Sequence, residues 1–155
     1  LSNAELAWMA SLPCVRPLND EVLLCHGTPS SDITYLLQTT DRAATAAEIE
    51  ERLGTVSATL VLCGHTHVAR SVRCKGTLTV NPGSVGQPAF EDDLPHPHVI
   101  ETGSPDARYA IVEKRNGHWV ADLISVPYAH QPMAELARLR HRPDWECALL
   151  TGYMR

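Results

Sequence analysis

The five cysteines of this sequence form neither a disulfide framework nor a Cys-x-x-Cys pair. Their number is odd and their spacing is scattered. Cys25 and Cys63 lie within apolar runs, where a free thiol packs as a small hydrophobic side chain. A pattern without paired cysteines is typical of a reducing compartment. We therefore expect a cytoplasmic protein.

A long apolar run and a basic stripe are also missing. No segment approaches the roughly 20 apolar residues that a membrane-spanning helix needs, so we expect no membrane association. The formal net charge is −5, whereas general nucleic-acid binding depends on clustered Lys and Arg. The one basic cluster, Arg138, Arg140 and Arg142, ends a helical pattern, where cations stabilise the helix dipole. No general nucleic-acid binding is expected, and the sequence carries no signal for the oligomeric state.

The remaining composition is that of an ordinary globular protein, with 44% hydrophobic and 20% charged residues. A chain of 155 residues can bury the core of one domain. No internal repeat, low-complexity tract or linker divides it. We predict a single domain over residues 1–155.

The segment LVLCGHTHV, residues 60–68, carries the clearest chemical signal. Residues 60–63 form an apolar run typical of a buried strand, and Gly64 breaks it. His65 and His67 follow, and in extended backbone residues two apart project to the same side. Imidazole is the commonest metal ligand near neutral pH. The segment therefore favours a metal site at a strand end over a solvent-facing pair.

Two further segments repeat or extend this pattern. In EVLLCHGTP, residues 21–29, an apolar run ends in cysteine and is followed by His26 and Gly27. Two such strands indicate parallel neighbours that deliver histidines to one sheet edge, where ligands of open α/β sheets collect. In TLTVNPGSVGQ, residues 77–87, a strand precedes a turn whose backbone N–H groups either meet an anion or close the loop.

At these residues the sequence resembles the calcineurin-like metallophosphoesterases. The family carries a histidine in an HGTP-like context, then a GHTH motif, then an NPGS turn. The chain has all three in the same order, at residues 26–29, 64–67 and 81–84, and the resemblance covers nearly the whole chain. It implies an α/β fold in which two sheets form a sandwich flanked by helices, with two divalent metal ions at one end.

The resemblance also implies roles for the three histidines. His26 and His65 resemble ligands of one metal, and His67 resembles a ligand of the other. Two cations about 3.5–4 Å apart activate a bridging water and clamp phosphoryl oxygens, and imidazole suits Mn, Fe, Zn, Ni or Co. The implied function is that of a dinuclear-metal-dependent phosphoesterase. It would hydrolyse a small phosphomonoester or phosphodiester substrate.

The family's earlier motifs do not occur in this sequence. We find no D-x-H, no segment that supplies a bridging Asp, and no G-N-H-D/E that carries the catalytic histidine. Residues 1–13 resemble the helix that follows the last of these motifs. The alternative interpretation is that Ser2, Asn3 and Ala4 are the remnant of an expression tag. We therefore expect a metallophosphoesterase domain whose N-terminal part is missing, and catalytic residues that lie in that part. The full-length protein is predicted to be an enzyme, and the isolated chain to be deficient or inactive.

Two other interpretations stay open. The first is a non-catalytic phosphoesterase-like scaffold that binds a partner, although no structural need explains three convergent histidines. The second is a zinc-stabilised structural domain in which Cys25 or Cys63 joins the histidines as a fourth ligand. A rival histidine pair, His96 and His98, lies in residues 88–105. That segment has no buried strand before it, so we expect an irregular surface loop rather than ligands.

The other local patterns predict a conventional set of elements. Thr45 and Glu48 form a capping box that opens a helix ending at Gly54. Two hairpins are expected, at residues 75–76 and 116–117. Helices are expected over residues 4–12 and 133–139, and helical turns over residues 32–37 and 143–150. Within residues 32–37, the apolar side chains 35–37 are expected to pack rather than bind a ligand.

Overall fold

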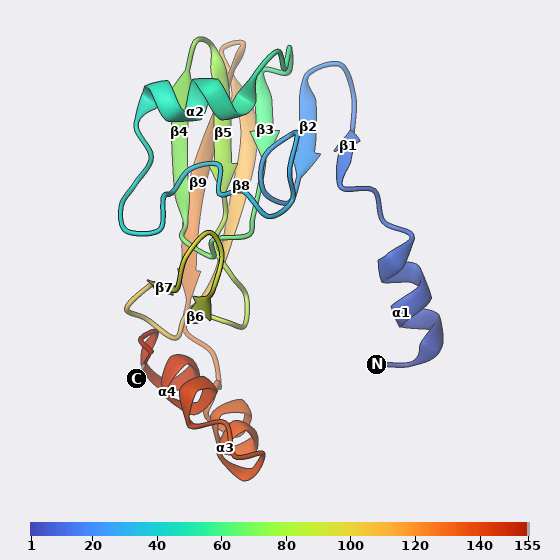
Figure 1. The fold of residues 1–155 in the computed structure, drawn as a ribbon. Coiled ribbons are helices and arrows are strands. Elements are labelled where there is room, and N and C mark those ends of the chain that lie inside the picture. Colours follow the sequence, from blue (N-terminus) through green and yellow to red (C-terminus); the bar gives the residue numbers. More distant parts are fainter. Residues whose placement is uncertain (155) are drawn as a thin grey trace.

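The computed structural model describes residues 1–154, and a five-stranded sheet lies at its centre (Figure 1). The strand order is β1-β2-β3-β5-β4. β2, β3 and β5 are parallel neighbours, and β1 and β4 pair antiparallel at the two edges. The strands are β1 (Val15–Pro17), β2 (Val22–Cys25), β3 (Leu60–Leu62), β4 (Arg70–Cys74) and β5 (Thr77–Asn81). The predicted parallel pairing of the two histidine-bearing strands is confirmed.

The strand register aligns the three segments singled out in the sequence. Leu24, Leu62 and Val80 are in line across β2, β3 and β5. Beyond this row the Gly64 N–H donates to the His26 carbonyl at 2.8 Å, and the Cys63 N–H donates to the Val80 carbonyl at 2.9 Å. The segments that follow the three strands therefore leave the sheet side by side.

Helix α2 (Ala46–Leu53) covers one face of the sheet. Its predicted capping box is confirmed, because Thr45 accepts from the Glu48 N–H and Glu48 accepts from the Thr45 N–H. Ile49 and Leu53 are buried in a cluster with side chains of the sheet and of the preceding loop. Burial of the amphipathic face of α2, rather than helix propensity, fixes the helix here.

A long hairpin covers the opposite face. It consists of β8 (Ala107–Arg115) and β9 (His118–Val126), paired antiparallel as predicted. Buried apolar side chains of β2, β3 and β5 pack against the half-buried side of the hairpin, where Ala110, Val112, Trp119 and Ala121 lie. The predicted α/β architecture, with two sheets face to face and helices outside, is thus confirmed. Within residues 1–154 the second sheet is this hairpin.

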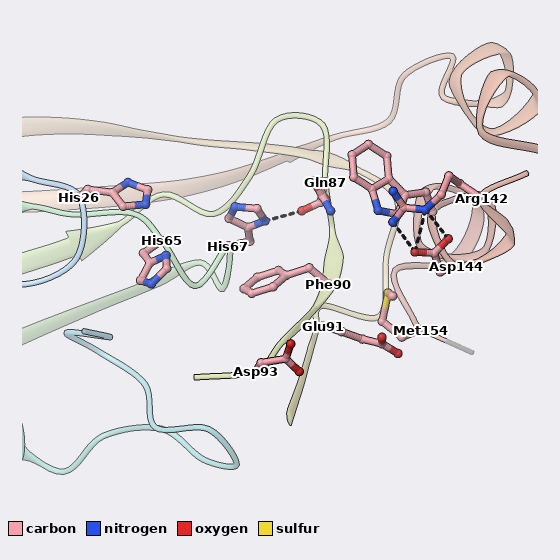
Figure 2. A pocket seen from close by; sticks show the side chains of 11 residues that line it. His26, His65, His67, Gln87, Phe90, Glu91, Asp93, Arg142, Asp144 and Met154 are labelled. Carbon is pink, nitrogen blue, oxygen red and sulfur yellow. Dashed lines mark hydrogen bonds and ion pairs between the residues drawn. The ribbon is translucent and has the colours of Figure 1, made fainter. Parts of the chain in front are cut away.

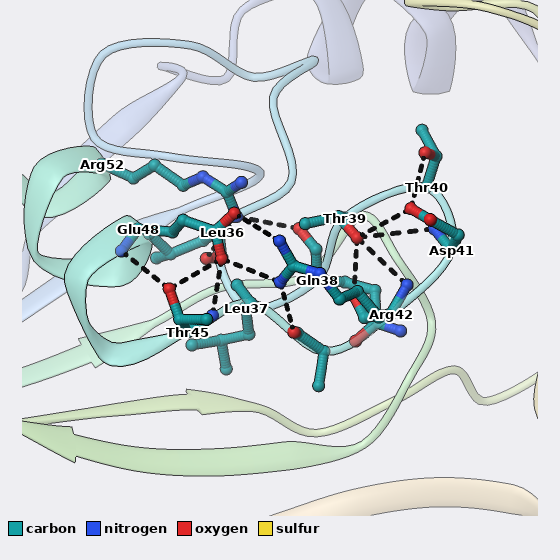
Figure 3. A network of polar contacts seen from close by, with 12 residues as sticks. Leu36, Leu37, Gln38, Thr39, Thr40, Asp41, Arg42, Thr45, Glu48 and Arg52 are labelled. Carbon is teal, nitrogen blue, oxygen red and sulfur yellow. Dashed lines mark hydrogen bonds and ion pairs between the residues drawn. The ribbon is translucent and has the colours of Figure 1, made fainter.

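The loop before α2 is held by arginine side chains (Figure 3). Arg52 donates to the carbonyls of Leu36 and Gln38 at 3.2 and 2.8 Å. Arg70 donates to the carbonyls of Leu37 and Ala44. The predicted helical turn over residues 32–37 is wrong, since these residues form bends without helix. The carbonyls are instead bonded to guanidinium groups and, for Leu37, also to the distant Ala44 N–H at 3.0 Å. The expected packing is confirmed, because side chains 35–37 are buried.

A second hairpin, much shorter than β8–β9, lies in the segment predicted to be irregular. It consists of β6 (Ala89–Asp92) and β7 (His98–Glu101), paired antiparallel. The prediction of an irregular loop over residues 88–105 is therefore wrong in part. Charges and prolines between the strands hide their short apolar pattern, because each strand has only four residues.

Two C-terminal helices, α3 (Gln131–Leu139) and α4 (Pro143–Thr151), pack against each other through Ala134, Ala137 and Leu149. Contacts between α4 and β6 bring this pair of helices close to the carboxyl ends of β2 and β3, where the histidines lie. The single helical turn predicted for residues 143–150 is a full helix, with a proline in its first turn.

Helix α1 (Asn3–Ala10) projects away from the sheets (Figure 1). It has a capping box between Ser2 and Glu5, but no residue of the helix is buried, and Trp8 is 63% exposed. Local capping alone therefore defines this helix. None of the helices within residues 1–154 is long and apolar enough to cross a bilayer.

Candidate metal centre

The three histidines predicted as metal ligands line one cavity of about 540 Å³ (Figure 2). His26 follows β2, while His65 and His67 follow β3. The ring centroids of His26 and His65 lie 4.9 Å apart. The remaining wall comes from the segment around β6 and from α4 with the residues beside it, namely Gln87, Phe90, Glu91, Asp93, Arg142, Asp144, Trp145 and Met154.

The histidine loop after β3 is not extended, contrary to the prediction. His65 and His67 have φ values of 68° and 59°, in the left-handed region. The Thr66 N–H donates to the Gly64 carbonyl at 2.8 Å, which closes a tight turn centred on His65. Such backbone costs about 1–3 kcal/mol at each residue and persists only where the surroundings hold it.

Asn81, at the end of β5, holds this loop. Its side chain, 1% exposed, donates to the Gly64 carbonyl at 2.6 Å and to the Thr66 hydroxyl at 3.0 Å. Its Oδ1 accepts from the Gly83 N–H at 2.9 Å. The NPGS turn thus uses this N–H within the fold, which favours loop closure over anion binding. Sequence analysis found the turn but not the contact of Asn81 with the histidine loop.

Hydrogen bonding leaves one nitrogen of each loop histidine free for a ligand. The Nδ1 atom of His67 lies 2.7 Å from the Gln87 carbonyl, which can only accept, so Nδ1 carries the proton. The lone pair of Nε2 is then available, as in metal sites where a carbonyl orients the ligating histidine. The Nε2 atom of His65 is buried and finds no hydrogen-bond partner among the described residues. A buried polar atom without a partner is costly, and a metal ion would satisfy it.

Burial also favours the neutral form of both loop imidazoles. It lowers the pKa of His65, and the nearby His26 acts in the same direction, against a backbone hydrogen bond with Ile33 that raises it. Burial likewise lowers the pKa of His67, with the other two histidines adding to the effect and the hydrogen bond to Gln87 opposing it. A neutral imidazole is the form that binds a metal.

The described residues offer the right type of donor atom for a divalent metal but too few ligands to hold one. Imidazole nitrogens, neutral and partly free, are suitable donors for a transition metal. Yet within residues 1–154 no group of three or more His, Cys, Asp or Glu side chains is placed to hold an ion. The ligand roles of the three histidines therefore stay a prediction. Any complete centre needs further donors.

Comparison with known proteins places this geometry in a family. The sequence matches the calcineurin-like phosphoesterase superfamily domain over residues 3–103, more than half of the chain. The chain belongs to this superfamily. The resemblance seen in the HGTP, GHTH and NPGS motifs is thus confirmed. No curated protein sequence matches the chain.

Two solved structures share the fold. A metallophosphoesterase from Sphaerobacter thermophilus superposes with a TM-score of 0.70 at 21% identity, over 96% of this chain and 62% of that one. A hypothetical protein from Pyrococcus horikoshii OT3 gives a TM-score of 0.70 at 15% identity, over 96% of this chain and 54% of that one. The chain therefore spans less than two thirds of the length of either structure.

The cysteines of this superfamily member are poor candidates for a fourth ligand. Burial raises the pKa of Cys25 to about 11 and raises the pKa of Cys63 as well. The Sγ atom of Cys25 lies 3.4 Å from the Gly27 carbonyl, and the Cys63 side chain is buried in the cluster under α2. A zinc ligand must be a thiolate, so these contacts argue against a zinc-stabilised structural site.

The rival pair of histidines is divided between two environments. His96 is exposed, whereas His98 begins β7 and is half-buried beside Tyr35. The Nε2 atom of His98 lies 2.9 Å from the Tyr35 hydroxyl. Neither histidine lines the cavity of the other three. The expectation of a surface loop is therefore wrong for His98, which belongs to the packed layer beside His65.

Proposed function

We propose that this chain supplies the histidine side of a dinuclear metal centre in a phosphoesterase. In the full-length protein the centre would hydrolyse a small phosphomonoester or phosphodiester. The observation that carries the proposal is that His65, whose buried Nε2 has no hydrogen-bond partner among the described residues, lines the same cavity as His26 and the carbonyl-oriented His67. Membership of the calcineurin-like phosphoesterase superfamily supports the same reaction class.

The three histidines have distinct tasks in this proposal. His26 and His65, with adjacent rings, would bind one ion, and His67 would bind the other. A bound pair of divalent ions, of Mn, Fe, Zn or Ni, supplies an activated water and charge stabilisation for the phosphoryl group. The chain contributes neutral donors, held by Asn81 and by the Gln87 carbonyl.

The isolated chain is proposed to be deficient or inactive. Three imidazoles neither offset the charge of two cations nor protonate a leaving group. A bridging carboxylate and an acidic group would have to come from outside the described residues, which hold no complete ligand set. The catalytic residues are therefore not assigned within this chain.

The charges on the cavity wall away from the histidines limit which leaving groups a substrate can carry. Glu91 and Asp93 line this wall, while Arg142 is paired with Asp144 at 2.5 Å and lies over the Trp145 ring at 4.5 Å. The two carboxylates without such a pair make this end acidic. A second phosphate there would be repelled. We therefore propose a substrate whose leaving group is neutral or cationic.

The decisive experiment measures hydrolysis by the full-length protein with added Mn²⁺, using an aryl phosphodiester and an aryl phosphomonoester. His67→Ala should lower kcat/KM by about 100-fold or more, since several kcal/mol of charge stabilisation in the transition state would be lost. His118→Ala is the matched control, because His118 lies on β9 and is exposed. Full activity in His67→Ala would refute the proposal.

The second candidate is a non-catalytic scaffold of the same fold. It predicts no metal-dependent turnover by the full-length protein and no effect of His67→Ala on partner binding.

The free state of all five cysteines among the described residues supports a cytoplasmic location as a proposal. We propose neither general nucleic-acid binding nor membrane association, and the oligomeric state is left open.

A further inference from the structure

Tyr35 lies between His65 and the β6–β7 hairpin. Its ring meets the His65 ring edge-on with centroids 4.8 Å apart, and it meets the His98 ring in the same way at 5.6 Å. The residue is 8% exposed. The His65 ring is thus in contact with both the His26 ring and the Tyr35 ring.

The Tyr35 hydroxyl has one proton and two acceptors of the hairpin within reach, of which His98 is the nearer. The Nδ1 atom of His98 lies 2.8 Å from the His96 carbonyl and therefore donates to it. The Nε2 atom is then an acceptor, and the Tyr35 hydroxyl donates to it across 2.9 Å. The Asp92 carboxylate lies 3.4 Å from the same hydroxyl. The exposed His96 contributes only its backbone to this chain of contacts.

The backbone around Tyr35 is fixed as well. The next residue, Leu36, has its carbonyl bonded to Arg52 (Figure 3). The Leu37 carbonyl is bonded to Arg70. The side chains of Leu36 and Leu37 are buried in the core under α2. Tyr35 is therefore held at its backbone by the core and at its hydroxyl by the hairpin.

The same hairpin orients the second loop histidine. Phe90, on β6, meets the His67 ring edge-on with centroids 4.9 Å apart. The Gln87 carbonyl, two residues before β6, accepts from His67 Nδ1. A single element thus touches His67 directly and reaches His65 through Tyr35.

We propose that Tyr35 is a positioning residue for His65, held in place by Asp92 and His98 of the β6–β7 hairpin. His65 needs such support because its backbone is left-handed and its Nε2 has no hydrogen-bond partner among the described residues. Without a fixed neighbour, rotation of the ring would change which part of the imidazole faces the cavity that His65 lines. The effect on metal binding rests on the proposed function, whereas the effect on the His65 ring does not.

The test uses the full-length protein and the substitutions Tyr35→Phe, Asp92→Asn and the two combined. Tyr109→Phe is the matched control, since Tyr109 is exposed on β8 and also loses only a hydroxyl. The first readout is the ¹⁵N–¹H correlation of the His65 imidazole in the metal-free protein. The second is the affinity for Zn²⁺, measured by competition with a chelator.

Tyr35→Phe should shift or broaden the His65 imidazole signals and weaken Zn²⁺ binding about 10- to 100-fold, the range typical of residues that orient a metal ligand. Asp92→Asn should act in the same direction but much more weakly, because the hydroxyl keeps its donation to His98 Nε2. The double variant should lose no more than Tyr35→Phe alone, because both act through one hydroxyl.

The proposal is overturned if the His65 signals in Tyr35→Phe match those in Tyr109→Phe, or if the two losses of Zn²⁺ affinity simply add. A lower melting temperature with unchanged His65 signals would show a purely structural role and would also overturn it. If Tyr35→Phe does not fold, Asp92→Asn carries the test with the same readouts. Because the imidazole signals need no turnover, failure here is distinguishable from failure of the proposed phosphoesterase activity.

Discussion

Among single residues, Asn81 makes the hydrogen bonds that hold the histidine loop in place. Two left-handed histidines store backbone strain, and one buried carboxamide connects the carbonyl before them, the threonine between them and the NPGS turn. The strain is tolerated because these hydrogen bonds fix the loop at both of its sides. Asn81 therefore links the GHTH and NPGS motifs physically, which explains why they work as a pair in this fold.

Asn81→Ala should lower the free energy of unfolding by about 2–4 kcal/mol. The substitution leaves the Gly83 N–H without its partner, and an unsatisfied buried group costs about 1–3 kcal/mol. It also removes one hydrogen bond each, worth about 1 kcal/mol, from the Gly64 carbonyl and the Thr66 hydroxyl, which keep another partner. Urea unfolding monitored by circular dichroism would measure the change. Asn3→Ala, in the unburied helix α1, is the control and should change the value little. A loss equal to that of the control would mean that the loop is held by other contacts.

The two loop histidines also make stability depend on pH. Burial is the main cause that lowers the pKa of both in the folded state, while unfolding restores the ordinary value of about 6.5. Below about pH 6.5 the unfolded chain therefore binds more protons than the folded chain. The free energy of unfolding is complete above that pH and falls as the pH drops through the folded-state values.

Urea unfolding of the metal-free protein between about pH 5 and 8 would show this fall. The double variant His65→Gln/His67→Gln removes both groups and should have a shallower slope below about pH 6.5. Other histidines contribute to both proteins equally, so the difference between the two curves isolates the loop pair. Superimposable curves would contradict the expectation.

Among the elements, those with a local signal were predicted from the sequence and those fixed by distant contacts were not. The capping box of α2, the apolar runs of β2 and β3, and the Asn116-Gly117 turn each carry their information within a few residues. The β6–β7 hairpin does not, since its four-residue strands are stabilised by α4 and by Tyr35.

The same distinction holds inside the candidate site. Three histidines behind apolar runs were recognisable as a group, because strand register brings strand ends together. The left-handed turn of the GHTH loop was predicted to be extended, since its conformation depends on Asn81, 14 residues after His67. Tyr35 was expected only to pack. Its polar contact with His98 spans 63 residues, and no pattern in the sequence reports it.

Two helices with the same kind of capping box provide a test at this scale. Thr45→Ala should lower the free energy of unfolding by about 1 kcal/mol, because α2 buries Ile49 and Leu53 and unfolds with the core. Ser2→Ala should leave the global value unchanged, because α1 buries no residue. Urea unfolding of both variants gives the comparison. A similar loss in both would show that α1 is coupled to the core.

At the scale of the whole molecule, the cavity joins parts of the chain with different tasks. The sheet edge supplies the three histidines, the β6–β7 hairpin orients them, and α4 closes the far end with Arg142 and Asp144. The segments after β2, β3 and β5 lie side by side because these strands are parallel neighbours and end at the same end of the sheet. The site therefore depends on the fold as a unit.

That arrangement predicts how much metal the chain retains. Three imidazoles without a complete ligand set among residues 1–154 should bind divalent ions weakly, since a dinuclear centre normally needs a bridging ligand to offset its charge. The isolated chain, purified with added Mn²⁺ and then passed through a desalting column, should retain clearly fewer than two ions per chain. The full-length protein should retain close to two, and its His67→Ala variant should retain fewer. Elemental analysis measures all three. Two tightly held ions in the isolated chain would mean that the missing ligands come from a second copy or from residues outside the cavity.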